Sequence, residues 1–211
     1  MRAVLFDLDG VLIDSVPAYR RAWALWAHLF SVSEESIWVD AHGRRPEDII
    51  YRVRPDVDLH EGVVAFDRSL AKAVNGHVQA APGARALLSE LSVGTYAIVT
   101  SSRRTHVSAL LAEARLRAPD VVICGEDVER GKPDPAGFVL AAQELGVPAA
   151  SCIVVEDAPA GIAGARAAGA AVVALSTTHR SRALTEADAV FDSLAKASRY
   201  VLEWVRSPSR G

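Results

Sequence analysis

The stretch that decides the fold is Ala3-Val4-Leu5-Phe6-Asp7-Leu8-Asp9-Gly10, an apolar run that ends in two acidic residues separated by a single leucine. An extended strand alternates its faces, so both carboxylates would point the same way if the strand continued through them. A buried strand end is a costly place for two negative charges, and a cation is therefore expected between Asp7 and Asp9. A hard divalent ion such as magnesium takes oxygen ligands and would keep Asp7 ionised as a nucleophile. The alternative is a strand that runs into an ordinary Asp-Gly turn.

A second apolar stretch, residues 96–99, is followed by the hydroxyl side chains of Thr100, Ser101 and Ser102. A helical pattern begins after them and runs from about 104 to 114. A hydroxyl together with free backbone N–H groups at a strand-to-helix junction is suited to holding a phosphate. The alternative is that these hydroxyls only cap the helix.

A lone cation, Lys132, stands shortly before another helical segment. Asp134 is the expected cap of that helix and Pro135 its expected first residue. Lys132 is therefore a candidate charge clamp for an anionic ligand. The alternative is an ordinary surface lysine.

A second pair of acids, Glu156 and Asp157, ends the apolar run 153–155 and precedes a helix predicted over 159–168. Gly169 fits the position just after the end of that helix. A solvated loop is the alternative for this acid pair. All four segments follow predicted strands, and ligands of open parallel sheets bind at the carboxyl ends of strands. Acids, a hydroxyl and a cation at one edge are what a phosphoryl-transfer site requires.

Four motifs in this order resemble the haloacid dehalogenase-like superfamily of phosphatases and phosphomutases. The motifs are DLDGVL (7–12), VTSS (99–102), GKP (131–133) and VVEDAPAG (154–161). They span most of the chain, so the resemblance implies both the fold and the reaction type.

The resemblance also implies a role for each matched residue. Asp7 resembles the nucleophile that becomes an aspartyl phosphate, and Asp9 resembles the general acid/base. Lys132 resembles the cation that steadies nucleophile and phosphate. The remaining implied roles are phosphate binding by Thr100 and the Ser101 backbone, and a magnesium site made by Asp7, Asp9, Asp157 and Glu156.

Periodicity predicts an α/β fold with a helical insertion. Short apolar strands alternate with helices from residue 80 onward, which favours a Rossmann-like parallel sheet with helices on both faces. Every periodic stretch between 15 and 79 has helical spacing. We therefore expect an α/β core domain of residues 1–14 and 80–211 and an inserted all-α cap domain of residues 15–79.

A cap over the site favours a small phosphorylated metabolite, because closure excludes water and bulky substrates alike. Residues 41–45 read Ala-His-Gly-Arg-Arg. This stretch resembles the HGxR segment in the cap of sugar-phosphate and polyol-phosphate phosphatases. His42 and Arg45 are therefore predicted to bind substrate, and the alternative is a basic connecting loop with surface arginines.

Composition narrows the classes of partner that the protein could bind. The net charge of the 211 residues is -3 without a basic block, which argues against a nucleic-acid partner. No apolar run approaches the ~20 residues of a membrane span, and a cytoplasmic location is expected. Cys124 and Cys152 lie in separate apolar runs and are predicted to be buried free thiols. The sequence does not indicate an oligomeric state.

The predicted function is a magnesium-dependent phosphatase that hydrolyses a small sugar, polyol or hydroxy-acid phosphate through an aspartyl-phosphate intermediate. One alternative is a phosphomutase of the β-phosphoglucomutase type. That family's pattern has a cap-side histidine where this chain has Tyr19, which weakens the alternative. A catalytically silent binding protein is disfavoured because every expected catalytic position is filled.

Overall fold

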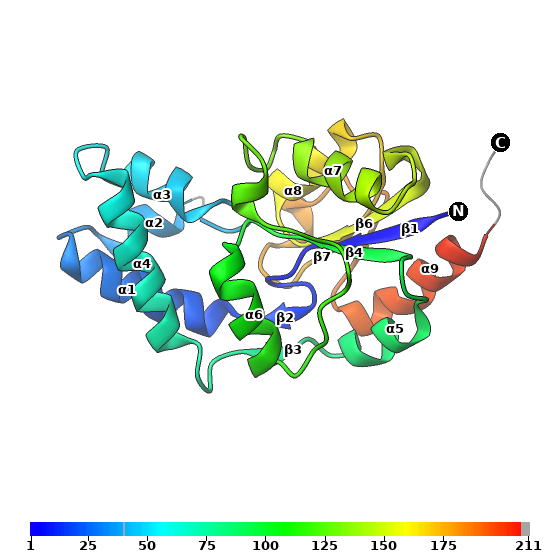
Figure 1. Ribbon diagram of the computed structural model, residues 1–211, viewed down its shortest axis with the longest axis horizontal. Helices are drawn as coiled ribbons and strands as arrows, with labels where there is room; N and C mark the ends of the chain where they lie inside the picture. The colour runs from blue at the N-terminus through cyan, green and yellow to red at the C-terminus, as the bar shows by residue number, and fades with distance from the viewer. Residues whose placement is uncertain (40, 208–211) are drawn as a thin grey trace.

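The computed structural model describes residues 1–39 and 41–207. Its centre is a six-stranded parallel sheet in the order β5-β4-β1-β6-β7-β8, with β1 between the two strands that carry the later motifs. Figure 1 shows this sheet between two layers of helices. The strands are β1 (Ala3–Phe6), β4 (Tyr96–Val99), β5 (Val122–Ile123), β6 (Cys152–Glu156), β7 (Ala171–Leu175) and β8 (Ala189–Phe191).

Both faces of the sheet are buried, and the strands are therefore continuously apolar. Along β1, Ala3 and Leu5 belong to one hydrophobic cluster while Val4 and Phe6 belong to the other. The first cluster is completed by α7 (Ala136–Glu144) and α8 (Pro159–Ala167). Its counterpart includes three helices, α5 (Ala84–Glu90), α6 (Arg104–Glu113) and α9 (Leu194–Arg206), and continues into the helices between residues 16 and 73.

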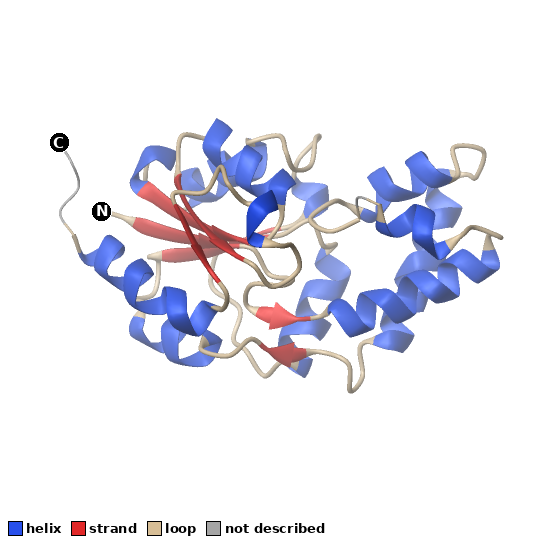
Figure 2. Ribbon diagram, turned by 180° about the vertical axis from the view of Figure 1, so that it is seen from behind, coloured by secondary structure: helices blue, strands red, loops and turns tan. Residues whose placement is uncertain are grey.

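Four consecutive helices lie beside the carboxyl ends of the sheet strands (Figures 1 and 2). Helices α1 and α4 form the main pair, and aromatic rings fill the space between them. The rings of Trp23 and Phe66 lie 4.2 Å apart, and the Trp26 indole N–H donates to the Gly62 carbonyl. We refer to this block as the cap. Its helices are α1 (Val16–Leu29), α2 (Glu34–Trp38), α3 (Pro46–Val53) and α4 (Leu59–Ala73).

The chain enters and leaves the cap through two short antiparallel strands, β2 (Ile13–Asp14) and β3 (Gln79–Ala80). The sequence analysis did not predict them, because two residues are too few to show an alternating pattern. The predicted boundaries at 14/15 and 79/80 fall at these strands. The division into two domains remains a prediction.

The predicted fold class, a Rossmann-like α/β core with a helical cap, is confirmed. The helix after Lys132 begins at Ala136, one residue later than predicted, and the Asp134 carboxylate accepts a hydrogen bond from the Ala136 amide. Gly169 follows α8 with a φ of 79°. Cys124 and Cys152 are buried and unpaired. Among the described residues, every helix is too short or too polar to cross a membrane.

Candidate active site

The parallel sheet brings the four motifs together at one edge. Strand β1 pairs with β4 on one side and β6 on the other, so the residues that follow these strands lie next to one another. Asp7 follows β1, Thr100 follows β4 and Asp157 follows β6. Lys132 arrives from the loop between β5 and α7. Residues separated by as many as 150 positions in the chain thereby share one site, Asp7 and Asp157 among them.

Lys132 joins two buried carboxylates. Its ammonium group donates to Asp7 Oδ1 at 2.6 Å, to Glu156 Oε1 at 2.5 Å and to the Val99 carbonyl at 3.1 Å. An ammonium has three N–H donors, and all three are used here. Burial alone would lower the pKa of Lys132, but Asp7 and Glu156 together raise it above its usual value. Lys132 therefore carries a permanent positive charge beside the predicted nucleophile, and the alternative of a surface lysine is wrong.

Burial raises the pKa of Asp7 to about 8; Lys132 opposes the shift and Glu156 adds to it. The pKa of Asp157 is raised well above its usual value by burial, and then by Glu156 and Asp7. Each of these three carboxylates offers an oxygen within 4.8 Å of the others. One lysine does not balance three negative charges at such distances.

This cluster of Asp7, Glu156 and Asp157 fits a hard divalent cation. The donors are all carboxylate oxygens, which magnesium prefers, and further positive charge would relieve their mutual repulsion. Two glycines make room for these carboxylates. A methyl group at Gly10 would overlap the Asp157 carboxylate, and one at Gly161 would overlap that of Glu156. The Asp9 carboxylate is not part of this cluster, so a side-chain role for Asp9 in metal binding stays a prediction.

Magnesium should stabilise the protein, because the cation would bind the folded cluster and not the unfolded chain. At a free concentration 100 times its Kd, the gain in the free energy of unfolding is about 2.7 kcal/mol. Asp157→Asn should remove most of this gain. Thermal unfolding with magnesium and with chelator measures it, and Asp192→Asn, an exposed acid paired with Lys196, is the matched control. An undiminished gain in Asp157→Asn would contradict the assignment of Asp157 to the metal site.

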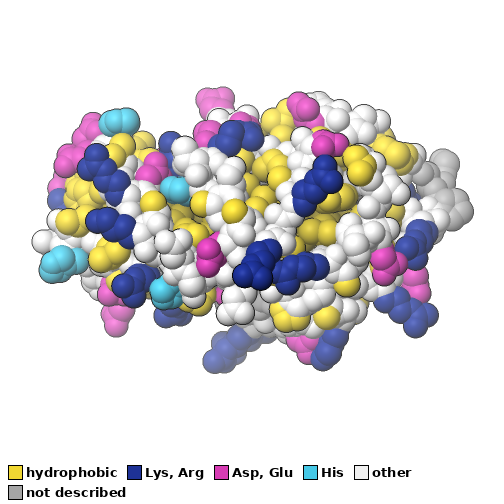
Figure 3. Space-filling view, turned by 60° about the horizontal axis from the view of Figure 1, so that its bottom comes forward, with side chains coloured by type: hydrophobic (Ala, Val, Ile, Leu, Met, Phe, Trp, Pro, Cys, Tyr) yellow, Lys and Arg dark blue, Asp and Glu magenta, His cyan; other side chains and the backbone are white. Residues whose placement is uncertain are grey.

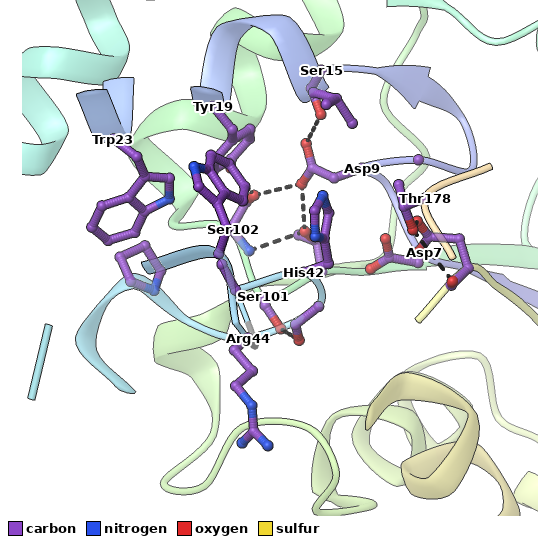
Figure 4. Close-up of a pocket in the computed structure, with 18 residues that line it drawn as sticks. Asp7, Asp9, Ser15, Tyr19, Trp23, His42, Arg44, Ser101, Ser102 and Thr178 are labelled. Atoms are coloured by element: carbon purple, nitrogen blue, oxygen red, sulfur yellow. Dashed lines mark hydrogen bonds between the residues drawn. The ribbon is translucent and has the colours of Figure 1, made fainter. Parts of the chain in front are cut away.

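Asp9 is held by hydroxyl groups (Figure 4). Strand β1 ends at Phe6, so the expected strand-like alternation does not continue to Asp9. The Asp9 carboxylate therefore has different partners from the Asp7 carboxylate. Ser15 donates to Asp9 Oδ1 at 2.5 Å and Ser102 donates to Asp9 Oδ2 at 2.7 Å, with Thr100 at 3.5 Å from Oδ2. Burial raises the pKa of Asp9, and the hydrogen bonds from Ser15 and Ser102 oppose that shift.

Ser15 and Ser102 are contacts of Asp9 that were not predicted from the sequence. Ser15 looks like the cap of α1, but its hydroxyl makes no capping bond and donates to Asp9 instead. Ser102 was grouped with the hydroxyls that could hold phosphate. The contact between Ser102 and Asp9 joins positions 93 residues apart in the chain and has no signature in either local segment.

The predicted phosphate-holding residues lie at the junction between β4 and α6. Thr100 is buried, and its hydroxyl oxygen accepts the Ser102 amide at 3.0 Å. The Ser101 hydroxyl donates to the Gly43 carbonyl at 2.8 Å and so contacts the cap. Both residues border the same pocket as Asp7 and Asp9, which is the position that phosphate binding requires.

The pocket lies between core and cap and encloses about 590 Å³ of space, part of it open to solvent. Ring-bearing cap residues form one wall: Tyr19, Trp23, Trp38, His42 and Pro46. The His42 ring lies 5.3 Å from that of Trp38 and 5.5 Å from that of His179. Burial lowers the pKa of His42, and His179 and Arg20 lower it further, so a neutral imidazole faces the pocket at neutral pH.

The two arginines that follow Gly43 have different surroundings. Arg44 borders the pocket, although its guanidinium extends away from Asp7 and Asp9 in Figure 4. Arg45 does not border that pocket. It pairs bidentately with Asp48 and donates to the Val128 and Glu129 carbonyls of the core. Substrate binding by Arg45 stays a prediction, and the contacts in the structure are those of a cap-to-core clamp.

Arg45→Ala should raise KM about 2–5-fold and leave kcat within about 2-fold, because it removes the hydrogen bonds to the Val128 and Glu129 carbonyls that hold the cap against the core. Steady-state kinetics on any accepted ester measures both constants. Asp48→Asn, which removes the partner that orients Arg45, should have a similar effect. An Arg45→Ala defect at least ten times that of Asp48→Asn would indicate that Arg45 binds substrate directly.

A second cap-to-core contact begins at the N-terminus of α6. Arg103 pairs with Glu47 of α3 and lies 3.4 Å from an Asp67 oxygen of α4. His106 Nε2 lies 3.3 Å from the other Asp67 oxygen. Arg103 therefore lies where core and cap meet.

Comparison with known proteins identifies the family. A family model described as haloacid dehalogenase-like hydrolase matches residues 1–169. The chain belongs to the haloacid dehalogenase-like hydrolases. It is 37% identical to hexitol phosphatase A of Escherichia coli, covering 92% of this chain and 91% of that protein. It is 36% identical to validoxylamine A 7'-phosphate phosphatase of Streptomyces hygroscopicus, covering 92% and 95%.

A solved structure of β-phosphoglucomutase from Clostridium difficile superposes with a TM-score of 0.79 at 21% identity, covering 97% of each chain. At that identity the likeness shows the fold alone. The predictions of the superfamily, of a hydrolase and of a phosphatase are confirmed by these comparisons together. The substrate, the metal and the intermediate are inferred below from the residues of the site.

Proposed function

We propose that this protein is a magnesium-dependent phosphatase of small phosphorylated sugars or polyols that works through an aspartyl phosphate on Asp7. The observation that carries the proposal is the setting of Asp7. Its carboxylate lies 2.6 Å from a buried ammonium, within a carboxylate cluster suited to a divalent cation, and two residues before a carboxylate held by hydroxyls. Nucleophile, charge clamp and general acid/base are thereby adjacent.

The first half-reaction uses all three groups. An Asp7 oxygen attacks phosphorus, and the bond between phosphorus and the ester oxygen breaks as Asp9 gives its proton to that oxygen. Lys132 and the donors at Thr100 and Ser101 balance the charge on the phosphoryl oxygens. A divalent cation held by Asp7, Glu156 and Asp157 would add to this charge neutralisation.

The second half-reaction regenerates Asp7. Asp9, now ionised, takes a proton from water, and the water oxygen attacks phosphorus while the bond to Asp7 breaks. The hydroxyls of Ser15 and Ser102 favour this ionised form, because both donate to its oxygens. Inorganic phosphate leaves and Asp7 is again a free carboxylate.

The pocket supports a small substrate. Its wall combines aromatic rings with hydroxyl and imidazole groups. Such a wall suits the hydrocarbon faces and hydroxyls of a sugar or polyol, and the relatives named above include a hexitol phosphatase. Hydroxy-acid phosphates remain a further class to test. Lys and Arg side chains are scattered among acidic and apolar ones over the face in Figure 3, and we expect a cytoplasmic enzyme that binds neither membrane nor nucleic acid.

Phosphate release from a panel of sugar, polyol and hydroxy-acid phosphates, with magnesium and with chelator, tests the proposal. We expect release that requires magnesium and is confined to a few esters. Unchanged release in chelator would contradict the metal. Absence of release from every ester, by a protein shown to be folded, would favour a phosphomutase or a silent binding protein, and a coupled assay with β-glucose 1-phosphate separates these two.

A further inference from the structure

Tyr19 is a cap residue that is connected to Asp9 through one side chain, Ser102. It lies in α1, one helical turn after Ser15, and its hydroxyl lies 2.5 Å from Ser102 Oγ. Ser102 Oγ in turn donates to Asp9 Oδ2 at 2.7 Å. A serine hydroxyl has one proton to give. Because Ser102 gives its proton to Asp9, Tyr19 must be the donor to Ser102.

The tyrosine is fixed in this orientation. Its amide donates to the Ser15 carbonyl at 3.0 Å within α1, and its ring lies 6.1 Å from that of Phe66 in α4. Burial, and then the charge of Asp9, raise its pKa well above the usual value, so that the phenol keeps its proton. A protonated and packed hydroxyl therefore faces Ser102 throughout the neutral range.

Ser15, the residue before α1, and Tyr19 within α1 thus act on both oxygens of Asp9. Ser15 donates directly to Oδ1, and Tyr19 acts on Oδ2 through Ser102 (Figure 4). Ser102 belongs to the core and Tyr19 to the cap. The chain of hydrogen bonds from Tyr19 to Asp9 therefore crosses from cap to core.

We propose that Tyr19 is a positioning residue that aims the Asp9 carboxylate through Ser102 and so links cap closure to general acid/base catalysis. The inference rests on the proposed function. Without the phenol, the Ser102 hydroxyl loses the donor that fixes its direction and rotates among other acceptors. The Asp9 carboxylate then shifts by a fraction of an ångström, and proton transfer is sensitive to displacements of that size.

The dependence of the rate on the leaving group distinguishes a positioning role from a merely structural one. An alkoxide from a polyol phosphate needs the proton of Asp9, whereas acetate leaves acetyl phosphate without one. The constant kcat/KM reports the steps up to departure of the leaving group. Tyr19→Phe should lower kcat/KM for the best polyol or sugar phosphate about 10-fold, mainly in kcat, and change it less than about 2-fold for acetyl phosphate.

Two further variants sharpen this comparison. Tyr51→Phe is the matched control, because Tyr51 is a cap tyrosine in α3 whose side chain is largely exposed, and both constants should equal those of wild type. Ser102→Ala should show the same dependence on the leaving group. The double variant Tyr19→Phe/Ser102→Ala should be no worse than Ser102→Ala alone, since both changes break one chain of hydrogen bonds. Thermal unfolding verifies that each variant is folded.

Two results would overturn the inference while leaving the phosphatase in place. One is Tyr19→Phe with wild-type constants on both substrates. The other is an equal loss on both, which would make Tyr19 a residue of general packing or phosphate binding. A wild-type protein that hydrolyses neither ester would instead contradict the proposed function, and the inference with it.

Discussion

Asp7→Asn is expected to lower kcat by a factor on the order of 10⁴ or more while the protein stays folded. An amide of the same shape has no negative charge and no effective nucleophilic oxygen. Lys132 keeps Glu156 as a charged partner at 2.5 Å, so the buried ammonium is not left alone. Phosphate release under saturating substrate measures the loss, and a thermal unfolding curve shows whether the fold is intact.

One outcome would contradict this expectation for Asp7→Asn. Turnover by Asp7→Asn within about 10-fold of wild type would mean that another group, or water itself, attacks phosphorus. Asp14→Asn is a suitable control on the same segment, because Asp14 is exposed and lies in β2 at the entrance to the cap. Its activity should equal that of wild type.

Lys132→Met is expected to destabilise the protein by about 3–5 kcal/mol and to remove detectable turnover. Methionine occupies much of the volume of the lysine stem but leaves Asp7 and Glu156 buried without their shared cation. Breaking a buried ion pair costs far more than breaking an exposed one, because the remaining charges cannot be solvated. Chemical denaturation measures the change in the free energy of unfolding.

Lys196→Met provides the contrast. Lys196 pairs with Asp192 on the surface of α9, and its loss should cost less than about 1 kcal/mol. Adding Glu156→Gln to Lys132→Met should recover part of the stability, since one uncompensated charge is gone, but not the activity. Equal stability losses for Lys132→Met and Lys196→Met would contradict the structural role given to Lys132.

The core of the site could be predicted because its residues follow strands that the sequence marks clearly. Strands buried on both faces read as uninterrupted apolar runs, and polar side chains directly after such runs must meet at the carboxyl edge of a parallel sheet. Asp7, Thr100 and Asp157 all obey this rule. Lys132 follows a short strand and a loop, and its place before a helix and in the motif order pointed to the site.

The contacts between cap and core could not be predicted in the same way. Tyr19, Arg45 and Arg103 reach partners set by how one block of helices lies against the sheet, and no local spacing encodes that placement. The hydrogen bond from Ser15 to Asp9 could not be predicted for a related reason. A serine before a helix favours capping, and only the position of Asp9 in space shows that the hydroxyl has another acceptor.

The excess negative charge of the buried carboxylates affects both stability and catalysis. Folding buries three carboxylates beside one lysine, and the excess negative charge is unfavourable unless a cation joins them. The same excess prepares the site for catalysis, because the cation that relieves it would also attract a phosphate ester and neutralise its oxygens. Stability and activity should therefore respond together to magnesium.

The most direct test of the central claim is to trap the phosphoryl group on Asp7. Asp9→Asn cannot activate water well, but acetyl phosphate needs no proton to release acetate, so this variant should accumulate the aspartyl phosphate in magnesium. Acid quenching, trypsin digestion and mass spectrometry should find one phosphoryl group on the peptide of residues 3–20, labile to hydroxylamine and absent from Asp7→Asn/Asp9→Asn. Release of phosphate by the wild type with no phosphorylated peptide in folded Asp9→Asn, or a phosphoryl group that persists without Asp7, would contradict the account.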